Sequence, residues 1–233
     1  MSQPVTHTLE VIEIFESLQG EGPSVGQPAL FLRLAGCNLG CQWCDTAYAW
    51  DWTRFDRKAA KRMVVSDLAA QVRDLPGRRL VVTGGEPLIQ QKSVSALLAA
   101  IEAERFVEVE TNGTVVPIES LLSRVDQWNV SPKLSHNGQP LEKRIRLDAL
   151  RALRDTERAW LKLVVRSEAD LQEAEDLVRE LGWTKSRVQF MPLARNRDEH
   201  RQRAAALAEA CLARGYGFSP RLQLDLWDGR RGK

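Results

Sequence analysis

The sequence predicts an α/β fold built on a mainly parallel β-sheet, and three observations favour it. Short apolar, β-branched runs recur along the chain, helical patterns separate most of them, and polar or glycine-containing stretches follow their carboxyl ends. Strands that alternate with helices form right-handed βαβ units, which give a parallel sheet that is either open or partly closed into a barrel. The length suits one large domain, so we expect residues 1–233 to form a single domain.

Seven runs have the composition of strands. They are rich in Val, Leu and aromatic residues, which pack well on a pleated, buried surface. We expect strands over residues 28–35, 78–83, 105–110, 126–130, 160–165, 187–192 and 221–227.

Helical patterns lie between these strands. Ser66 is a candidate N-cap for the first helix, and Ser167 and Gly182 bound another in the way that capping residues do. We expect helices over residues 66–75, 92–104, 167–182 and 198–214, together with a strongly basic helix over 53–65.

The stretches that follow the strands carry the candidate functional residues. The carboxyl ends of parallel strands meet at one edge of a sheet or barrel, where the active site is built. Each stretch alone is typical of ordinary turns, but their shared position favours a site. The stretches are GCNLGCQWC (36–44), TGGEP (83–87), ETNGT (110–114), SPK (131–133) and QFMPL (189–193).

Composition excludes several classes of protein. The 33 Lys and Arg residues nearly balance the 31 acidic residues, so the net charge of +2 gives no broad basic field for nucleic acid. No apolar run approaches the roughly 20 residues that span a bilayer, and the N-terminus lacks the pattern of a leader peptide. Three of the four cysteines are crowded, unlike a disulfide framework. We expect a cytoplasmic protein.

The crowded cysteines are Cys37, Cys41 and Cys44. A structural zinc site normally has four protein ligands, and only a histidine could supply the fourth here. A four-iron cluster held by three cysteines instead leaves one iron open to a substrate or cofactor. Three thiols in this spacing favour the cluster, and zinc remains the alternative.

The spacing Cys-x3-Cys-x2-Cys also resembles that of the radical S-adenosylmethionine superfamily. Residues 13–51, together with TGGEP, ETNGT, SPK and LKLVV, resemble the 7-carboxy-7-deazaguanine synthase family of queuosine and deazapurine biosynthesis. The resemblance implies a partial (β/α) barrel, a 4Fe-4S cluster, S-adenosylmethionine and Mg²⁺. It also implies a lyase that contracts the ring of 6-carboxy-5,6,7,8-tetrahydropterin to 7-carboxy-7-deazaguanine with release of ammonia.

Site residues follow from the same resemblance, position by position. It implies Cys37, Cys41 and Cys44 as cluster ligands, and Thr46 as the Mg²⁺ ligand. The cofactor-binding residues are Trp43, Cys44, Asp45, Gly85, Glu86, Ser131, Pro132 and Lys133. The substrate-binding residues are Leu18, Gln19 and Gly20 of the SLQGEG segment, with Arg33 for the substrate carboxylate and Thr83.

Partners and alternatives complete the expectations. The resemblance implies a homodimer with a small pterin substrate, and the basic stretch over 53–65 suits an acidic, flavodoxin-like electron donor. A glycyl-radical activating enzyme is the alternative function, but it has no use for SLQGEG. Cys211 is expected to be a buried helix residue, and Lys162 either reaches the site or extends from the sheet edge. The C-terminal stretch departs from the family pattern at Asp225, where a histidine is expected.

Overall fold

The computed structural model describes residues 6–101 and 104–233. Within these residues the strands form one nine-stranded sheet in the order β3-β1-β2-β4-β5-β6-β7-β8-β9. The strands are β1 (Thr8–Leu18), β2 (Pro28–Leu34), β3 (Lys61–Val64), β4 (Arg79–Gly84), β5 (Phe106–Thr111), β6 (Gln127–Val130), β7 (Ala159–Val165), β8 (Val188–Pro192) and β9 (Gly217–Phe218).

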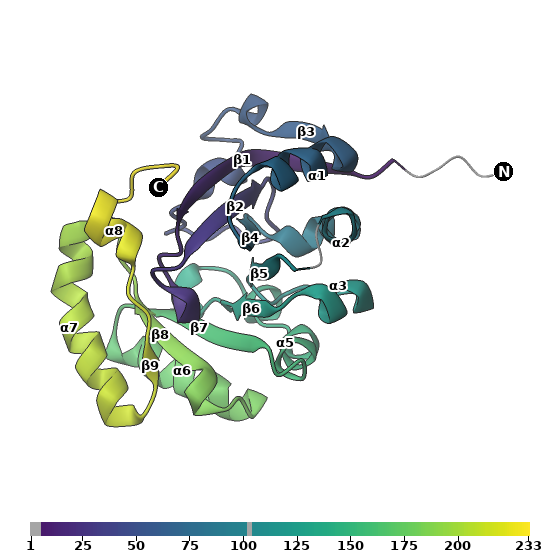
Figure 1. Ribbon diagram of the computed structural model, residues 1–233. Coiled ribbons are helices and arrows are strands. Elements are labelled where there is room, and N and C mark those ends of the chain that lie inside the picture. Colours follow the sequence, from purple (N-terminus) through teal and green to yellow (C-terminus); the bar gives the residue numbers. More distant parts are fainter. Residues whose placement is uncertain (1–5, 102–103) are drawn as a thin grey trace.

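The sheet is mainly parallel and open. Every neighbouring pair from β2 to β9 is parallel, whereas β1 runs antiparallel to both β2 and β3. Figure 1 shows the strands following an arc with helices around its outside, and β3 and β9 form its two edges without pairing with each other. The expected partial barrel is therefore confirmed.

Helices connect the strands and cover the outer face of the arc (Figure 1). They are α1 (Val65–Asp74), α2 (Gln91–Ala100), α3 (Glu119–Arg124), α4 (Leu141–Arg144), α5 (Leu147–Arg154), α6 (Glu168–Leu181), α7 (Arg197–Arg214) and α8 (Leu222–Trp227). None of the helices in the described parts of the chain is both long and apolar enough to cross a bilayer.

Six of the seven expected strands are confirmed, and the seventh is wrong. Residues 221–227 form the helix α8 instead. The preceding strand β9 ends just before Ser219-Pro220, and a proline cannot donate to a strand ladder. The apolar residues of this stretch face in several directions along a short helix, and of these only Leu224 is buried.

Two expected helices need correction. Residues 53–65 do not form a helix, because their centre is a single 3-10 turn (Arg57–Ala59) and their end pairs with β1 as the edge strand β3. Ser66 lies inside α1, whose N-cap position is Val64. Ser167 and Gly182 do cap α6, since the Ser167 side chain accepts a bond from Asp170 N and Gly182 adopts a φ of 62°. Residues 102–103, within the helix expected over 92–104, lie outside the described residues.

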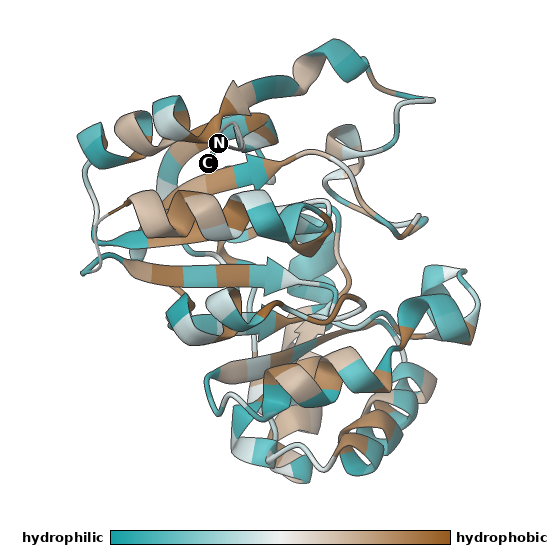
Figure 2. Cartoon of the chain, turned by 90° about the vertical axis from the view of Figure 1, so that its right-hand side faces the viewer, coloured by the Kyte–Doolittle hydropathy of each residue, from teal (hydrophilic) through white to brown (hydrophobic). Residues whose placement is uncertain are grey.

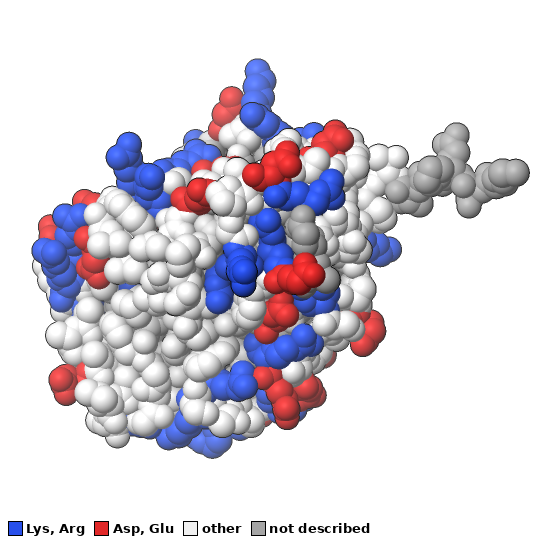
Figure 3. All heavy atoms as spheres, in the orientation of Figure 1, with Lys and Arg blue, Asp and Glu red and all other residues white. Residues whose placement is uncertain are grey.

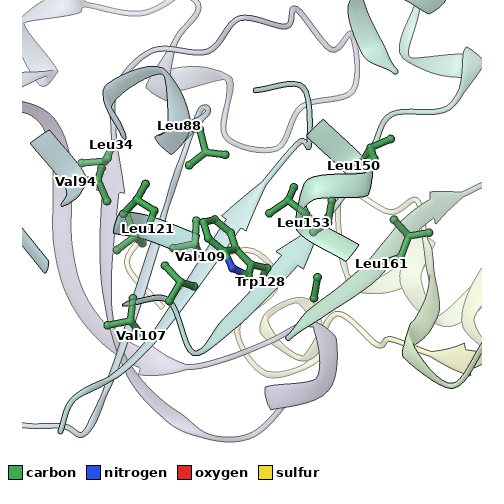
Figure 4. Packing of buried hydrophobic residues seen from close by; sticks show 14 of the residues in the cluster. Leu34, Leu88, Val94, Val107, Val109, Leu121, Trp128, Leu150, Leu153 and Leu161 are labelled. Carbon is green, nitrogen blue, oxygen red and sulfur yellow. The ribbon is translucent and has the colours of Figure 1, made fainter. Parts of the chain in front are cut away.

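The main core lies between the sheet and its helices. Trp128 of β6 is fully buried, and Figure 4 shows it between Val107, Val109 and Leu121 on one side and Leu153 on the other. Apolar residues follow the strands and the inward helix faces in Figure 2, whereas basic and acidic side chains are interspersed on the face in Figure 3. The core thus packs against the outer face of the sheet and leaves the carboxyl ends of the strands for a site.

Candidate active site

A cavity of about 230 Å³ lies at the carboxyl ends of the parallel strands. All five of the expected polar clusters contribute to its wall, although they come from five different strand ends. Their lining residues include Cys37, Cys41, Cys44, Thr83, Gly84, Gly85, Glu110, Thr111, Asn112, Ser131, Lys133, Met191 and Leu193. The parallel sheet therefore brings distant segments into one site.

The three thiols of the cluster loop share one kind of environment. Each sulfur accepts an N–H bond from a different neighbour, an arrangement that suits a negatively charged thiolate. The contacts are Leu39 N to Cys37 Sγ (3.4 Å), Asn137 Nδ2 to Cys41 Sγ (2.8 Å) and Trp50 Nε1 to Cys44 Sγ (3.3 Å).

The thiols fit an iron–sulfur cluster better than a single zinc ion. Burial raises the pKa of the Cys37 thiol to about 12 and also raises that of Cys41, so a bound metal has to supply the positive charge that keeps them ionised. Within residues 6–101 and 104–233, no three Cys, His, Asp or Glu side chains converge as ligands of one ion. A single zinc ion needs its ligands to converge on one point, whereas an iron–sulfur cluster does not, because each thiolate binds a different iron.

The GGEP turn packs tightly against the strand that leads to the cysteines. A Cβ atom on Gly85 would lie 2.0 Å from the carbonyl oxygen of Gly36, so only glycine fits. Glu86 does not line the cavity. Its carboxylate is fully buried and accepts bonds from Leu88 N, Thr111 Oγ1 and Asn112 N, so it fixes two strand ends to each other.

Part of the expected cofactor-binding wall is in place. Lys133 Nζ donates to the carbonyl oxygen (2.8 Å) and hydroxyl (3.0 Å) of Ser131, and it lies 5.8 Å from the Trp43 ring. Trp43 Nε1 is buried and has no hydrogen-bond partner in the described parts of the chain, which suits contact with a bound molecule. Pro132 and Glu86 are the two expected site residues that the cavity wall does not include.

Residues 17–21 of the SLQGEG segment also line the cavity. Gln19 is almost fully buried, and its Nε2 donates to Glu108 Oε1 (2.7 Å) and Glu110 Oε1 (3.2 Å). Thr83 Oγ1 donates to the other oxygen of Glu110 at 2.7 Å. Burial and the nearby charge of Glu110 raise the pKa of Glu108. Glu110, which sequence reasoning missed as a site residue, is therefore oriented by Thr83 of the neighbouring strand β4 and by Gln19 of the SLQGEG segment.

Arg33 lies in the cavity wall on β2. Its Nε binds Glu13 Oε1 at 2.8 Å, and its two terminal nitrogens have no hydrogen-bond partner among the described residues, so they can bind a ligand. Tyr48 also donates to Glu13, at 2.9 Å. Burial opposes ionisation of Glu13, but the Tyr48 bond and the Arg33 charge outweigh it and hold the pKa of Glu13 below its ordinary value.

Comparison with known proteins agrees with this geometry. The model of the radical SAM superfamily matches residues 32–201. The 7-carboxy-7-deazaguanine synthase of Pyrobaculum aerophilum is 38% identical over 229 residues, which cover 98% of this chain and 99% of the relative. The chain belongs to the 7-carboxy-7-deazaguanine synthase family. The synthase of Hyperthermus butylicus is 34% identical over 93% of this chain and 92% of its own.

Solved structures give the same family. The crystal structure of QueE from Escherichia coli superposes with a TM-score of 0.67 at 27% identity, covering 91% of this chain and 93% of that one. Streptococcus suis SuiB, at 14% identity and a TM-score of 0.54, shows likeness of fold alone. As a member of this radical SAM family, the chain uses a 4Fe-4S cluster and S-adenosylmethionine.

This member of the synthase family also carries a buried ion-pair chain that the sequence analysis missed. Lys162 of β7 binds Glu21 at 2.5 Å, Arg221 Nε binds the other Glu21 oxygen at 3.0 Å, and Arg221 continues to Asp45 of the cluster loop. Burial opposes the charge on Glu21, yet the Lys162 and Arg221 charges hold the pKa of Glu21 well below its ordinary value. Lys162 thus reaches the site and is not at the sheet edge.

The structure also shows where Asp225 and Cys211 lie relative to the cavity. Asp225 does not line the cavity, because it pairs with His200 Nδ1 at 3.0 Å behind the wall. Gln223 and Arg221 from the same stretch do line it. Cys211 is buried in α7, as expected, and is remote from the three cluster thiols in the cavity wall.

Proposed function

We propose that the cavity contracts the ring of 6-carboxy-5,6,7,8-tetrahydropterin to 7-carboxy-7-deazaguanine, with release of ammonia. One observation carries the proposal: a single cavity of about 230 Å³ is lined both by the three thiols and by residues of the SLQGEG segment. A small planar heterocycle fits such a cavity, and a protein substrate has no need of one. The glycyl-radical activating alternative gains no support from these features.

Cys37, Cys41 and Cys44, which all line the cavity, would hold the cluster. When bound, the cluster and S-adenosylmethionine supply a 5′-deoxyadenosyl radical by reductive cleavage of the cofactor. Lys133 and Ser131 are placed to bind oxygen atoms of the cofactor, and Trp43 offers its free N–H. In place of Glu86, whose carboxylate is occupied by protein donors, we assign backbone contact to the Gly84-Gly85 turn.

Arg33, Thr83 and Glu110 define the proposed orientation of the pterin. Arg33 of β2 pairs with Thr83 of β4, and Glu110 lies on the next strand, bonded to Thr83. Two strand spacings of about 4.8 Å separate the arginine from the glutamate by roughly 10 Å. Arg33 can bind the substrate carboxylate with a charge-assisted fork, and Glu110 can accept from the N–H donors at the pyrimidine end.

Leu18, Gln19 and Gly20 would then border the pterin, with Gln19 keeping Glu110 oriented. Thr46 is the proposed Mg²⁺ ligand, supported by its place in the wall beside Asp45. A Mg²⁺ ion keeps several waters and accepts few protein oxygens, so one hydroxyl is a sufficient anchor when the substrate contributes others.

Assembly, electron supply and location are further proposals. The homodimer rests on the family resemblance alone, and size measurement in solution tests it. For the acidic, flavodoxin-like donor, support comes from Arg54 and Arg57, whose side chains are 57% and 70% exposed just past Trp50 and its bond to Cys44. Free, crowded cysteines support the reducing cytoplasm. The single sheet supports residues 1–233 acting as one domain.

Anaerobic turnover tests the function. The reconstituted protein, S-adenosylmethionine, Mg²⁺, a reductant and the carboxy-tetrahydropterin should give 7-carboxy-7-deazaguanine, identified by mass, and ammonia. The Cys41→Ala protein, prepared in the same way, is the control. A brown wild-type protein that cleaves S-adenosylmethionine but leaves the pterin unchanged would overturn the substrate proposal.

A further inference from the structure

Arg221 is the most heavily engaged charged residue at the cavity. Its side chain is only 6% exposed, although it lies in the short loop between β9 and α8. The guanidinium binds Glu21, Asp45 and the carbonyl oxygen of Ala194, while the backbone N of Arg221 donates to His200 Nε2 at 3.2 Å. Three segments, around Glu21, around Asp45 and over residues 194–200, therefore meet at one arginine.

Two of these partners, Glu21 and Asp45, line the cavity and come from different segments. Glu21 belongs to the SLQGEG segment, the proposed pterin-binding segment, and Asp45 directly follows the cluster ligand Cys44. The two acids differ in setting, because the side chain of Glu21 is 15% exposed whereas that of Asp45 is 51% exposed. Glu21 has a second cation, Lys162, but Arg221 is the only cation that pairs with Asp45 within the described residues.

We infer that Arg221 is a positioning residue, which holds the cluster loop in register with the pterin-binding segment through Asp45 and Glu21. This inference rests on the proposed function. The planar guanidinium group of Arg221 can bind two carboxylates at fixed angles. The single ammonium group of a lysine cannot reproduce this geometry. The residue thereby acts through Asp45 and Glu21 to keep the cofactor-binding and pterin-binding parts of the wall in register.

The role predicts loss of coupling with the cluster intact. In Arg221→Met we expect normal iron and sulfide content and release of 5′-deoxyadenosine without pterin within twofold of wild type. The yield of 7-carboxy-7-deazaguanine per 5′-deoxyadenosine should fall at least tenfold, because a misplaced pterin loses near-attack geometry. Arg221→Lys should recover only part of this yield.

Arg197→Ala is the matched control, since Arg197 also ties α7 to the C-terminal helix, through the carbonyl oxygens of Asp225 and Leu226, but contacts neither Glu21 nor Asp45. It should leave the yield unchanged. Asp45→Asn provides a second test. When Arg221→Met is added to Asp45→Asn, the yield should fall by less than a further threefold, because the two residues act through one contact.

The outcomes separate the inference from the proposed function. Failure of the wild-type protein to convert the pterin overturns the function. A productive wild-type protein with a normal yield in Arg221→Met overturns the inference alone. The inference is also overturned if the losses of yield in Arg221→Met and Asp45→Asn are independent and multiply in the double variant. An equal loss of yield in Arg197→Ala would overturn it too, because that result would show a general effect of loosening the C-terminal helix.

Discussion

Replacing Gly20 by alanine tests how the C-terminal helix docks on the pterin-binding segment. A Cβ atom there would lie 1.9 Å from Gln223 Oε1 and 2.8 Å from its Cδ, closer than atoms approach in real structures. Gln223 is not free to move, since its Nε2 donates to Glu21 at 2.7 Å and Leu222 N donates to Gly20 O at 2.9 Å. The substitution must therefore either compress the contact or displace the amide.

Both routes have a similar free-energy cost. Overpacking a tight contact costs about 1 to 3 kcal/mol. Losing the bond from Gln223 to the charged Glu21 costs about 1.5 to 3 kcal/mol. We expect Gly20→Ala to lower the free energy of unfolding by about 2 kcal/mol, which is roughly 4 to 8 °C in Tm for a chain of this size. Product formation should fall, while cluster content stays normal.

A double-mutant cycle with Gln223→Ala checks the reasoning by thermal or denaturant unfolding. With the amide gone, the nearest remaining atom is the Gln223 backbone N at 3.2 Å, so Gly20→Ala should cost less than about 1 kcal/mol in that background. Gly26→Ala is the control, because its φ of 82° is strained for alanine but nothing lies within 4 Å. Its cost should be the same in both backgrounds. Strict additivity for Gly20→Ala and Gln223→Ala would refute the steric explanation.

Three other predictions concern the cluster, the substrate and pH. Alanine at any one of the three loop cysteines should reduce iron and sulfide content and abolish S-adenosylmethionine cleavage, whereas Cys211→Ala should do neither; an intact cluster in Cys41→Ala contradicts the ligand assignment. Arg33→Lys should weaken pterin binding roughly tenfold to a hundredfold, because it loses about 1.5 to 3 kcal/mol of charge-assisted bonding, while 5′-deoxyadenosine release without substrate persists; an unchanged Michaelis constant places the carboxylate elsewhere. Glu21→Gln should cost about 3 to 5 kcal/mol at pH 7, since it leaves buried Lys162 unpaired. Because the folded pKa of Glu21 lies below its ordinary value of 4.5, its contribution is present above pH 4.5 and is lost as the pH falls. Unfolding curves of Glu21→Gln and wild type should therefore converge in acid, and a constant difference down to pH 2 would be evidence against the ion pair.

The parallel part of the fold could be predicted from the sequence because its strands are buried on both faces. Such strands are continuous apolar runs, as in RLVVTG of β4, and they are easily recognised. The antiparallel edge was missed for the opposite reason. β1 mixes apolar and charged residues along TLEVIEIFESL, and β3 is the short, basic KRMV, so neither has the composition of a buried strand. The tertiary pairing with β2, and not local propensity, makes β1 a strand.

The candidate site was predictable where it depended on motifs and strand ends. Gly85, Thr83 and the three cysteines all lie in the wall. The bonds that the Glu86 carboxylate accepts from Leu88 N and Asn112 N could not be predicted, because a carboxylate in a turn gives no sign of them in the sequence. Arg221 is 200 residues from Glu21, and no periodicity or motif reports a contact across that separation.

The proposed orientation of the substrate rests on hydrogen-bond partners and not on a sequence motif. Glu110 accepts bonds from Gln19 and Thr83 but has no cation within an ion pair among the described residues, whereas neighbouring Glu108 is paired with Arg79 at 2.9 Å. A carboxylate that keeps only neutral donors remains a strong acceptor for further N–H groups. Arg33 is the converse case, because its bond to Glu13 leaves terminal N–H donors unused. An acceptor and a cation placed one strand apart on either side of Thr83 are complementary to a molecule with N–H donors at one end and a carboxylate at the other.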